Sequence, residues 1–109
     1  MLRTKKQIKT ICTECPLAKT ANLIGDTFTL LIIRDLLSEP KRFSEIESSL
    51  KGISSRTITK KLKLLETKNL IQKHISNERP PKTRYSLTKN GKALYKILET
   101  MRTYGEKYL

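Results

Sequence analysis

The sequence predicts a single, mainly α-helical domain that carries one small β-hairpin. The length of 109 residues suits one compact core and leaves no room for a second. Apolar residues recur at helical spacing through most of the chain. In one stretch, residues 70–87, that spacing gives way to two strand-like runs around a loop with two prolines. We therefore expect one domain over residues 1–109.

The positive charge of the chain is large and unevenly distributed. The formal net charge is +13, and residues 51–84 hold 10 basic and 2 acidic side chains. A basic N-terminal arm over residues 1–14 adds to this charge. Such clustering indicates a polyanionic partner, with nucleic acid as the first candidate. Lysines that serve only solubility would be scattered over the chain. The longest apolar runs, around residues 30–33, are far too short to span a membrane, so we expect no membrane partner.

The first two expected helices lie between residues 16 and 37. Pro16 is favoured at a first helical position, and Gly25 supplies a stop. A second helix runs from Asp26 or Thr27 to Leu37 and is mostly apolar around its circumference. That composition predicts the central helix of the core.

A short helix, a glycine turn and a longer helix follow. Pro40 breaks the second helix, and Ser44 with Glu47 forms the S-x-x-E pattern of a capping box. We therefore expect a third helix over residues 44–50. A turn at Gly52 leads to a fourth helix, which Ser54 caps and which runs to about residue 68. This order is that of a helix-turn-helix motif.

A basic hairpin and a long C-terminal helix complete the chain. Asn69 suits the left-handed conformation that ends a helix. Strands are expected over residues 70–75 and 84–87, joined by the loop 76–83. Residues 88–109 form the last helix, which we expect to be the dimerisation helix. The whole is a winged helix-turn-helix.

One face of the fourth helix is suited to DNA. At 100° per residue, Ile58, Leu62 and Leu65 form a stripe for the core, and the opposite face is basic. A recognition helix points its N-terminal half at base edges. We expect DNA contacts from Lys41, Arg42, Ser54, Ser55, Arg56, Thr59, Lys60, Lys63, Arg79, Lys82 and Arg84. Of these, Arg56 could read guanine, and the lysines suit phosphates. An ordinary solvated helix face is the open alternative.

Five strings of residues resemble the HxlR-type winged helix-turn-helix family, in matching order and spacing. They are CPL (15–17), LIGDTFTLLIIRDLL (23–37), RFSEIE (42–47), GISSRTITKKLKLLE (52–66) and RPPKTRYSLTKNGKAL (79–94). The resemblance implies a dimeric transcriptional regulator that binds a palindromic operator and dimerises through its N-terminal segment and C-terminal helix. Thr27-Phe28, Asn69 and Tyr104 depart from the family's usual residues, in positions that affect packing more than fold.

The C-terminal helix also predicts a homodimer without reference to any family. Its apolar stripe follows the completed wing, where so small a domain has little core left to cover it. The expected interface residues are Leu17, Leu94, Ile97, Leu98, Met101, Tyr104 and Tyr108. A two-fold dimer would place the recognition helices about 34 Å apart, one turn of DNA. Purely intramolecular packing of the stripe is the open alternative.

Two cysteines, Cys12 and Cys15, are candidates for redox chemistry. Cys15 directly precedes Pro16 at a helix start, where the helix dipole favours a thiolate. The family resemblance implies that a cysteine in this CP position can sense oxidants or electrophiles, with Cys12 as a resolving partner. A small buried thiol with no redox role is the alternative. One Cys-x-x-Cys pair supplies too few ligands for zinc, so no metal is expected.

The remaining motifs argue against catalysis. The single histidine, His74, has no partner placed by sequence, and there is no Gly-rich phosphate loop or catalytic triad pattern. We therefore expect no enzyme and no cofactor. Nothing resembles a signal peptide, which predicts a reducing cytoplasm. The predicted function is sequence-specific transcriptional regulation, as a repressor on double-stranded operator DNA; the alternative is a non-specific architectural DNA-binding or an RNA-binding protein.

Overall fold

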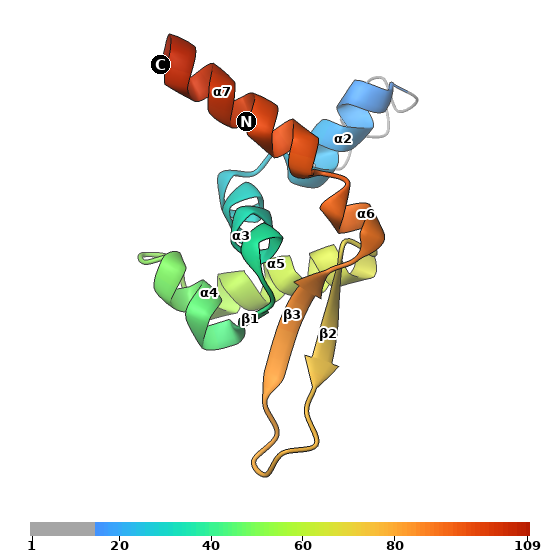
Figure 1. Cartoon of the computed structure of the whole chain (residues 1–109), viewed down its shortest axis with the longest axis vertical. Coiled ribbons are helices and arrows are strands. Elements are labelled where there is room, and N and C mark those ends of the chain that lie inside the picture. The colour runs from blue at the N-terminus through green and yellow to red at the C-terminus, as the bar shows by residue number, and fades with distance from the viewer. Residues whose placement is uncertain (1–14) are drawn as a thin grey trace.

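A computed structural model describes residues 15–109 as helices around a small antiparallel sheet (Figure 1). The elements are α2 (Pro16–Ile24), α3 (Thr27–Ser38), β1 (Lys41–Arg42), α4 (Phe43–Ser49), α5 (Ser55–Thr67), β2 (Ile71–Ile75), β3 (Thr83–Leu87), α6 (Lys89–Lys92) and α7 (Tyr95–Tyr108). The hairpin of β2 and β3 points away from α7, which lies at the opposite end of the view. This is the mainly helical, winged helix-turn-helix architecture that the sequence predicts.

The predicted helix ends at α2 and α3 are confirmed. Pro16 begins α2, and the N–H of Gly25 donates to the carbonyl of Ala21 over 2.7 Å, which closes the last turn. Asp26 caps α3 through its side chain, which accepts from the N–H of Thr29 at 3.2 Å. Capping by a short acidic side chain satisfies a backbone donor that the helix itself cannot.

The start of α4 differs from the prediction. The helix begins at Phe43, and Glu45 reaches back to accept from the backbone N–H of Arg42 at 2.9 Å. The predicted capping box of Ser44 and Glu47 is therefore wrong. Glu45 lies at the third helical position, where its carboxylate can reach the residue that precedes the helix, whereas Glu47 lies half a turn further on.

The sheet has three strands, where the sequence predicts two. Lys41 and Arg42, predicted as part of a helix break, form β1 and pair with Tyr85 and Arg84 of β3. The strand order is β1-β3-β2, all antiparallel. Pro40 prevents α3 from continuing, and the extended residues after it gain backbone partners in β3. Asn69 does adopt the left-handed conformation, with φ of 60°.

The predicted final helix is divided in two. Thr88 caps the short helix α6, since its hydroxyl oxygen accepts from the N–H of Gly91 at 3.1 Å. The chain then tightens, because Leu94 donates to the carbonyl of Gly91, three residues back. Leu94 is buried in the core, whereas α7 beyond it leaves in a new direction (Figure 1). The break thus lets α6 pack on the hairpin while α7 runs clear of it.

The core lies where the central helix α3 meets α4, α5 and the sheet. Its fully buried side chains come from every one of these elements: Ile32, Ile33, Ile46, Ile58, Leu62, Leu65 and Ile71. The three expected core residues of α5 are among them, so the amphipathic pattern of that helix is confirmed. The orientation of α5 is consequently fixed by burial of its apolar side.

Candidate nucleic-acid interface

Helix α5 presents a basic face to solvent. Ile58 is wholly buried, and Arg56, Lys60 and Lys63 on the other side of the helix are exposed. Ser54 caps the helix, with its oxygen accepting from the N–H of Thr57 at 3.1 Å. The helix begins after the turn from α4, so its N-terminal end lies beside α4 (Figure 1). These three cations form the core of the candidate interface.

An ion pair fixes α5 to the central helix. The ammonium of Lys61 contacts the carboxylate of Asp26, whose oxygen also accepts from the hydroxyl of Thr29 at 2.9 Å. Partial burial works to raise the pKa of Asp26, but the hydrogen bonds from Lys61 and Thr29 outweigh it and the pKa lies below its ordinary value. Lys61 is therefore a structural residue, unlike the three exposed cations on the same helix.

We expect Asp26→Ala to lower the free energy of unfolding by about 1–2 kcal/mol, because it removes both the cap of α3 and the pair with Lys61. Asp26→Asn keeps a capping oxygen and should lose less. Because the folded pKa is lowered, the charge of Asp26 stabilises the fold at neutral pH, and this contribution is lost as the pH falls through the folded pKa, below 3.8. Urea unfolding near pH 7 and near pH 3 measures both effects. Equal unfolding free energies for all three proteins at neutral pH would contradict the expectation.

The predicted hydroxyl contacts of α5 are engaged within the protein. Ser55 donates to the carboxylate of Glu47 on α4, and Thr59 donates to the carbonyl of Ser55 at 2.8 Å. Ser54 is the helix cap. The bond of Ser55 links α5 to α4, whereas those of Ser54 and Thr59 are local to α5. Sequence reasoning missed Glu47 in this role, because it lies on another helix, eight residues before Ser55.

The predicted contacts outside α5 fall on the sheet and its loop. Arg79 and Lys82 are exposed in the loop between β2 and β3, and Arg84 is exposed on β3. Arg84 stands directly opposite both Arg42 of β1 and His74 of β2 in the sheet. The like charges of Arg84 and Arg42 repel each other, which an anionic partner would relieve. The wing is thus a second cationic surface.

Lys41 forms an ion pair with a neighbouring acid. Its ammonium lies 3.0 Å from the carboxylate of Glu39. That hydrogen bond, the largest influence on the group, raises the pKa of Lys41. Of the two residues predicted before α4, Lys41 therefore has a protein partner, and Arg42 is half-buried at the start of α4.

The predicted dimerisation residues differ in exposure: α7 carries an exposed stripe, Leu94 is buried, Leu98 is half-buried, and Leu17 is exposed on α2. Ile97, Met101, Tyr104 and Tyr108 are between 38% and 64% exposed along α7. An open apolar hollow of about 610 Å³ lies over this stripe. Leu94, by contrast, is 7% exposed and belongs to the core, and Leu98 packs against it. Leu17, on α2, is 78% exposed.

Of the two candidate cysteines, the structure describes Cys15, whereas Cys12 lies outside the described residues. Cys15 occupies the N-cap position of α2 and is half-buried.

No group of three or more His, Cys, Asp or Glu side chains in residues 15–109 could hold a metal ion. His74 is exposed on β2. In the same part of the chain, every helix is too short or too polar to cross a membrane.

A helix-turn-helix followed by a basic β-hairpin wing defines the winged-helix class of proteins. The chain belongs to the HxlR-like helix-turn-helix family, whose model matches residues 23–109. The HTH-type transcriptional regulator YodB of Bacillus subtilis (strain 168) is 33% identical over 97 residues, covering 88% of this chain and 87% of YodB.

Solved structures agree with this assignment. A transcriptional regulator of the MarR family from Porphyromonas gingivalis W83 superposes with a TM-score of 0.82 at 33% identity, covering 88% of this chain and 94% of that chain. The redox regulator HypR in its reduced form gives 0.81 at 29% identity, covering 84% and 91%. YodB has been solved in reduced, diamide-treated and quinone-bound forms, the reduced form at a TM-score of 0.76, covering 86% of this chain and 93% of that chain.

Proposed function

We propose that this regulator is a homodimeric, sequence-specific repressor that binds a palindromic operator in double-stranded DNA. The single observation that carries the proposal is the exposed face of Arg56, Lys60 and Lys63 on α5, opposite its buried stripe. Bidentate hydrogen bonding to guanine suits Arg56, near the start of the helix, and phosphate neutralisation suits the two lysines. Arg79, Lys82 and Arg84 add a second phosphate contact through the wing. Its site of action would be the cytoplasm, where its operator lies.

The test is binding to the DNA upstream of the protein's own gene. Gel shifts at physiological salt should give at least about a 1,000-fold preference over random duplex of the same length. Binding that is equally strong on both would favour a non-specific architectural protein. Stronger binding to RNA than to either duplex would favour the RNA-binding alternative.

Arg56→Ala should weaken operator binding by about 1–3 kcal/mol per half-site and relax the preference at one base position. Lys63→Ala is the charge-matched comparison. It should weaken all sequences equally and lower the dependence of log K on log salt by about one per subunit. Binding to a library of single-base operator variants measures both. If the two variants lose affinity equally on every sequence, Arg56 does not read a base.

The proposed dimer is supported by α7. Its exposed apolar side chains form a stripe of a kind that monomeric proteins rarely leave open, and Leu17 of α2 is exposed as well. A two-fold partner packing there would set the spacing of two copies of α5. The palindrome of the operator would then mirror the symmetry of the protein.

We further propose that oxidants or electrophiles change operator affinity through Cys15. Support comes from its position at the start of α2, where a helix dipole favours thiolate, and from the relatives, two of which are described as redox-regulated or quinone-bound. Cys12 is the candidate partner in a disulfide. Diamide should change operator affinity at least about 10-fold in the wild type, and Cys15→Ser should abolish the response. Cys12→Ser separates a disulfide from modification of one thiol. An unchanged binding curve for the oxidised wild type would exclude the switch.

A further inference from the structure

Helix α4 brings a carboxylate to the start of helix α5. Glu47 lies on α4 and is half-buried, and its carboxylate accepts a hydrogen bond from the hydroxyl of Ser55, the first residue of α5. None of the ion pairs found in residues 15–109 involves Glu47. This negative charge lies at the N-terminal end of the helix that carries the basic face, where it opposes a phosphate. Its bond to Ser55 is therefore the favourable contribution that it can make to DNA binding.

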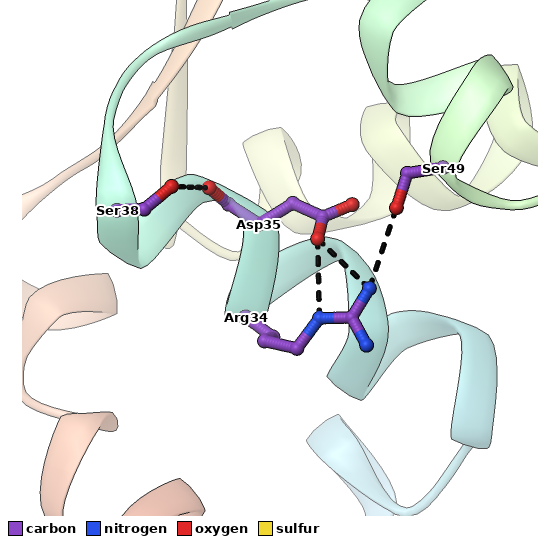
Figure 2. A network of polar contacts seen from close by, with 4 residues as sticks. All are labelled: Arg34, Asp35, Ser38 and Ser49. Atoms are coloured by element: carbon purple, nitrogen blue, oxygen red, sulfur yellow. Dashed lines mark hydrogen bonds and ion pairs between the residues drawn. The ribbon is translucent and has the colours of Figure 1, made fainter.

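Helix α4 is a fixed support for this carboxylate. Ile46, next to Glu47, is wholly buried in the core. At the end of the same helix, the hydroxyl of Ser49 accepts from Nη2 of Arg34 at 3.3 Å. Figure 2 shows that Nε and Nη2 of Arg34 also donate to Asp35, which holds the guanidinium in place beside α4. Packing and hydrogen bonding to α3 thus set where Glu47 lies relative to α5.

The hydroxyl of Ser55 differs from its neighbours at the start of α5 in the group to which it donates. The hydroxyls of Ser54 and Thr57 share one hydrogen bond of 2.9 Å. Thr59 donates to the backbone carbonyl of Ser55, one turn back in its own helix. Of these four hydroxyls, that of Ser55 donates to a carboxylate on another helix. Hydrogen bonds to charged acceptors are about twice as strong as neutral ones, so the proton of Ser55 is held toward Glu47.

This donation leaves the oxygen of Ser55 with acceptor capacity only. A serine hydroxyl has one proton and two lone pairs, and here the proton is already used. Phosphate oxygens, O6 and N7 of guanine and O4 of thymine are acceptors as well, so they offer no proton to such an oxygen. The donors that the bases present in the major groove are exocyclic amines, N6 of adenine and N4 of cytosine. A lone pair of Ser55 therefore matches those two bases.

We propose that Glu47 is a positioning residue that makes Ser55 an acceptor and so directs it to an adenine or a cytosine at one position of each operator half-site. The inference rests on the proposed function, in which the N-terminal residues of α5 meet base edges. Ser55 is exposed and directly precedes Arg56 in the helix. The two side chains divide the major-groove code between them, because Arg56 donates to guanine and Ser55 accepts from an amine.

The amine is tested on the DNA. Duplexes that the wild-type protein binds are first selected from a random library, and each adenine or cytosine of the selected half-site is then replaced by purine or pyrimidin-2-one, which lack the exocyclic amine. At one position, we expect the loss of the amine to weaken wild-type binding about 5-fold per half-site more than it weakens binding of Ser55→Ala. Any weakening of the base pair itself affects both proteins equally, so the difference between them isolates the contact.

Variants of the protein test the role of Glu47. Glu47→Ala should remove the preference for the amine at that position as Ser55→Ala does, and the double variant should lose no more of it than either. Glu47→Gln keeps an acceptor for the hydroxyl and should retain most of the preference. The control Glu66→Ala removes an equal charge from an exposed position on α5 and should change the affinity for every sequence by the same factor. Circular dichroism shows that each variant is folded.

Each contrary result has a distinct meaning. The proposal is overturned if no amine of the selected half-site distinguishes the wild type from Ser55→Ala, or if Glu47→Ala keeps the full preference. It is also overturned if Glu47→Gln loses the preference as completely as Glu47→Ala, since the charge of Glu47 and not its hydrogen bond would then act on binding. A wild type that selects no sequence from the library would overturn the proposed function together with this inference, and the first selection alone reveals that case.

Discussion

Ile97→Glu should convert the protein to a monomer and lower its operator affinity at least about 100-fold. Ile97 lies in the exposed apolar stripe of α7 and is 38% exposed in the single chain. In a two-fold interface each substitution occurs twice, so two carboxylates would be buried. Burying an unpaired charge costs several kcal/mol, and about 2.7 kcal/mol already corresponds to a 100-fold change in an equilibrium constant.

The matched control is Thr103→Glu, which adds the same charge to an exposed position on another side of α7. It should leave both dimerisation and operator binding close to wild type. Light scattering over a dilution series gives the oligomeric state, and circular dichroism shows that both variants remain folded. A dimeric Ile97→Glu protein with normal operator affinity would mean that the stripe of α7 is not the interface.

Local periodicity explains why much of the candidate interface can be predicted from the sequence alone. The buried stripe and basic face of α5 follow from side chains spaced three and four residues apart, and its cap Ser54 acts within three residues. The left-handed residue Asn69 is equally local. Features of this kind need no knowledge of what lies across the fold.

The features that sequence reasoning missed depend on distant partners. Strand β1 is two residues long and exists only because β3 lies beside it. Lys61 looks like its neighbours Lys60 and Lys63, but its partner Asp26 is 35 residues away. The division of α6 from α7 likewise depends on what α6 packs against, since the sequence there keeps its helical spacing. Tertiary contacts decide each of these cases.

The packing of α6 on the hairpin concentrates several such contacts at Gly91. The backbone carbonyl of Leu70 accepts from the N–H of Thr88 at 3.0 Å, and the hydroxyl of Thr88 donates to the carbonyl of Asn69 at 2.7 Å. These bonds draw α6 onto the chain where α5 passes into β2. Gly91 is buried at this approach.

Gly91→Ala should therefore destabilise the fold by about 3 kcal/mol or more, the upper range for overpacking. A Cβ at this position would lie 2.1 Å from the carbonyl oxygen of Leu70 and 2.9 Å from Cδ2 of Leu87. The first of these atoms belongs to the backbone, so relief requires α6 to move and the bonds of Thr88 to stretch. For a domain of this size, the melting temperature should fall by about 12–24 °C at equal protein concentration.

Gly105→Ala is the matched control, because this glycine lies within α7 and a Cβ there meets nothing within 4 Å. Alanine should raise stability by about 0.5–1 kcal/mol, since it restricts the unfolded chain and favours the helix. Replacing glycine by alanine is thus expected to lower the stability of the fold at Gly91 and to raise it at Gly105. Thermal and urea unfolding of both variants measure them. If Gly91→Ala melts at the wild-type temperature, α6 does not approach Leu70 as described, and the break between α6 and α7 loses its structural reason.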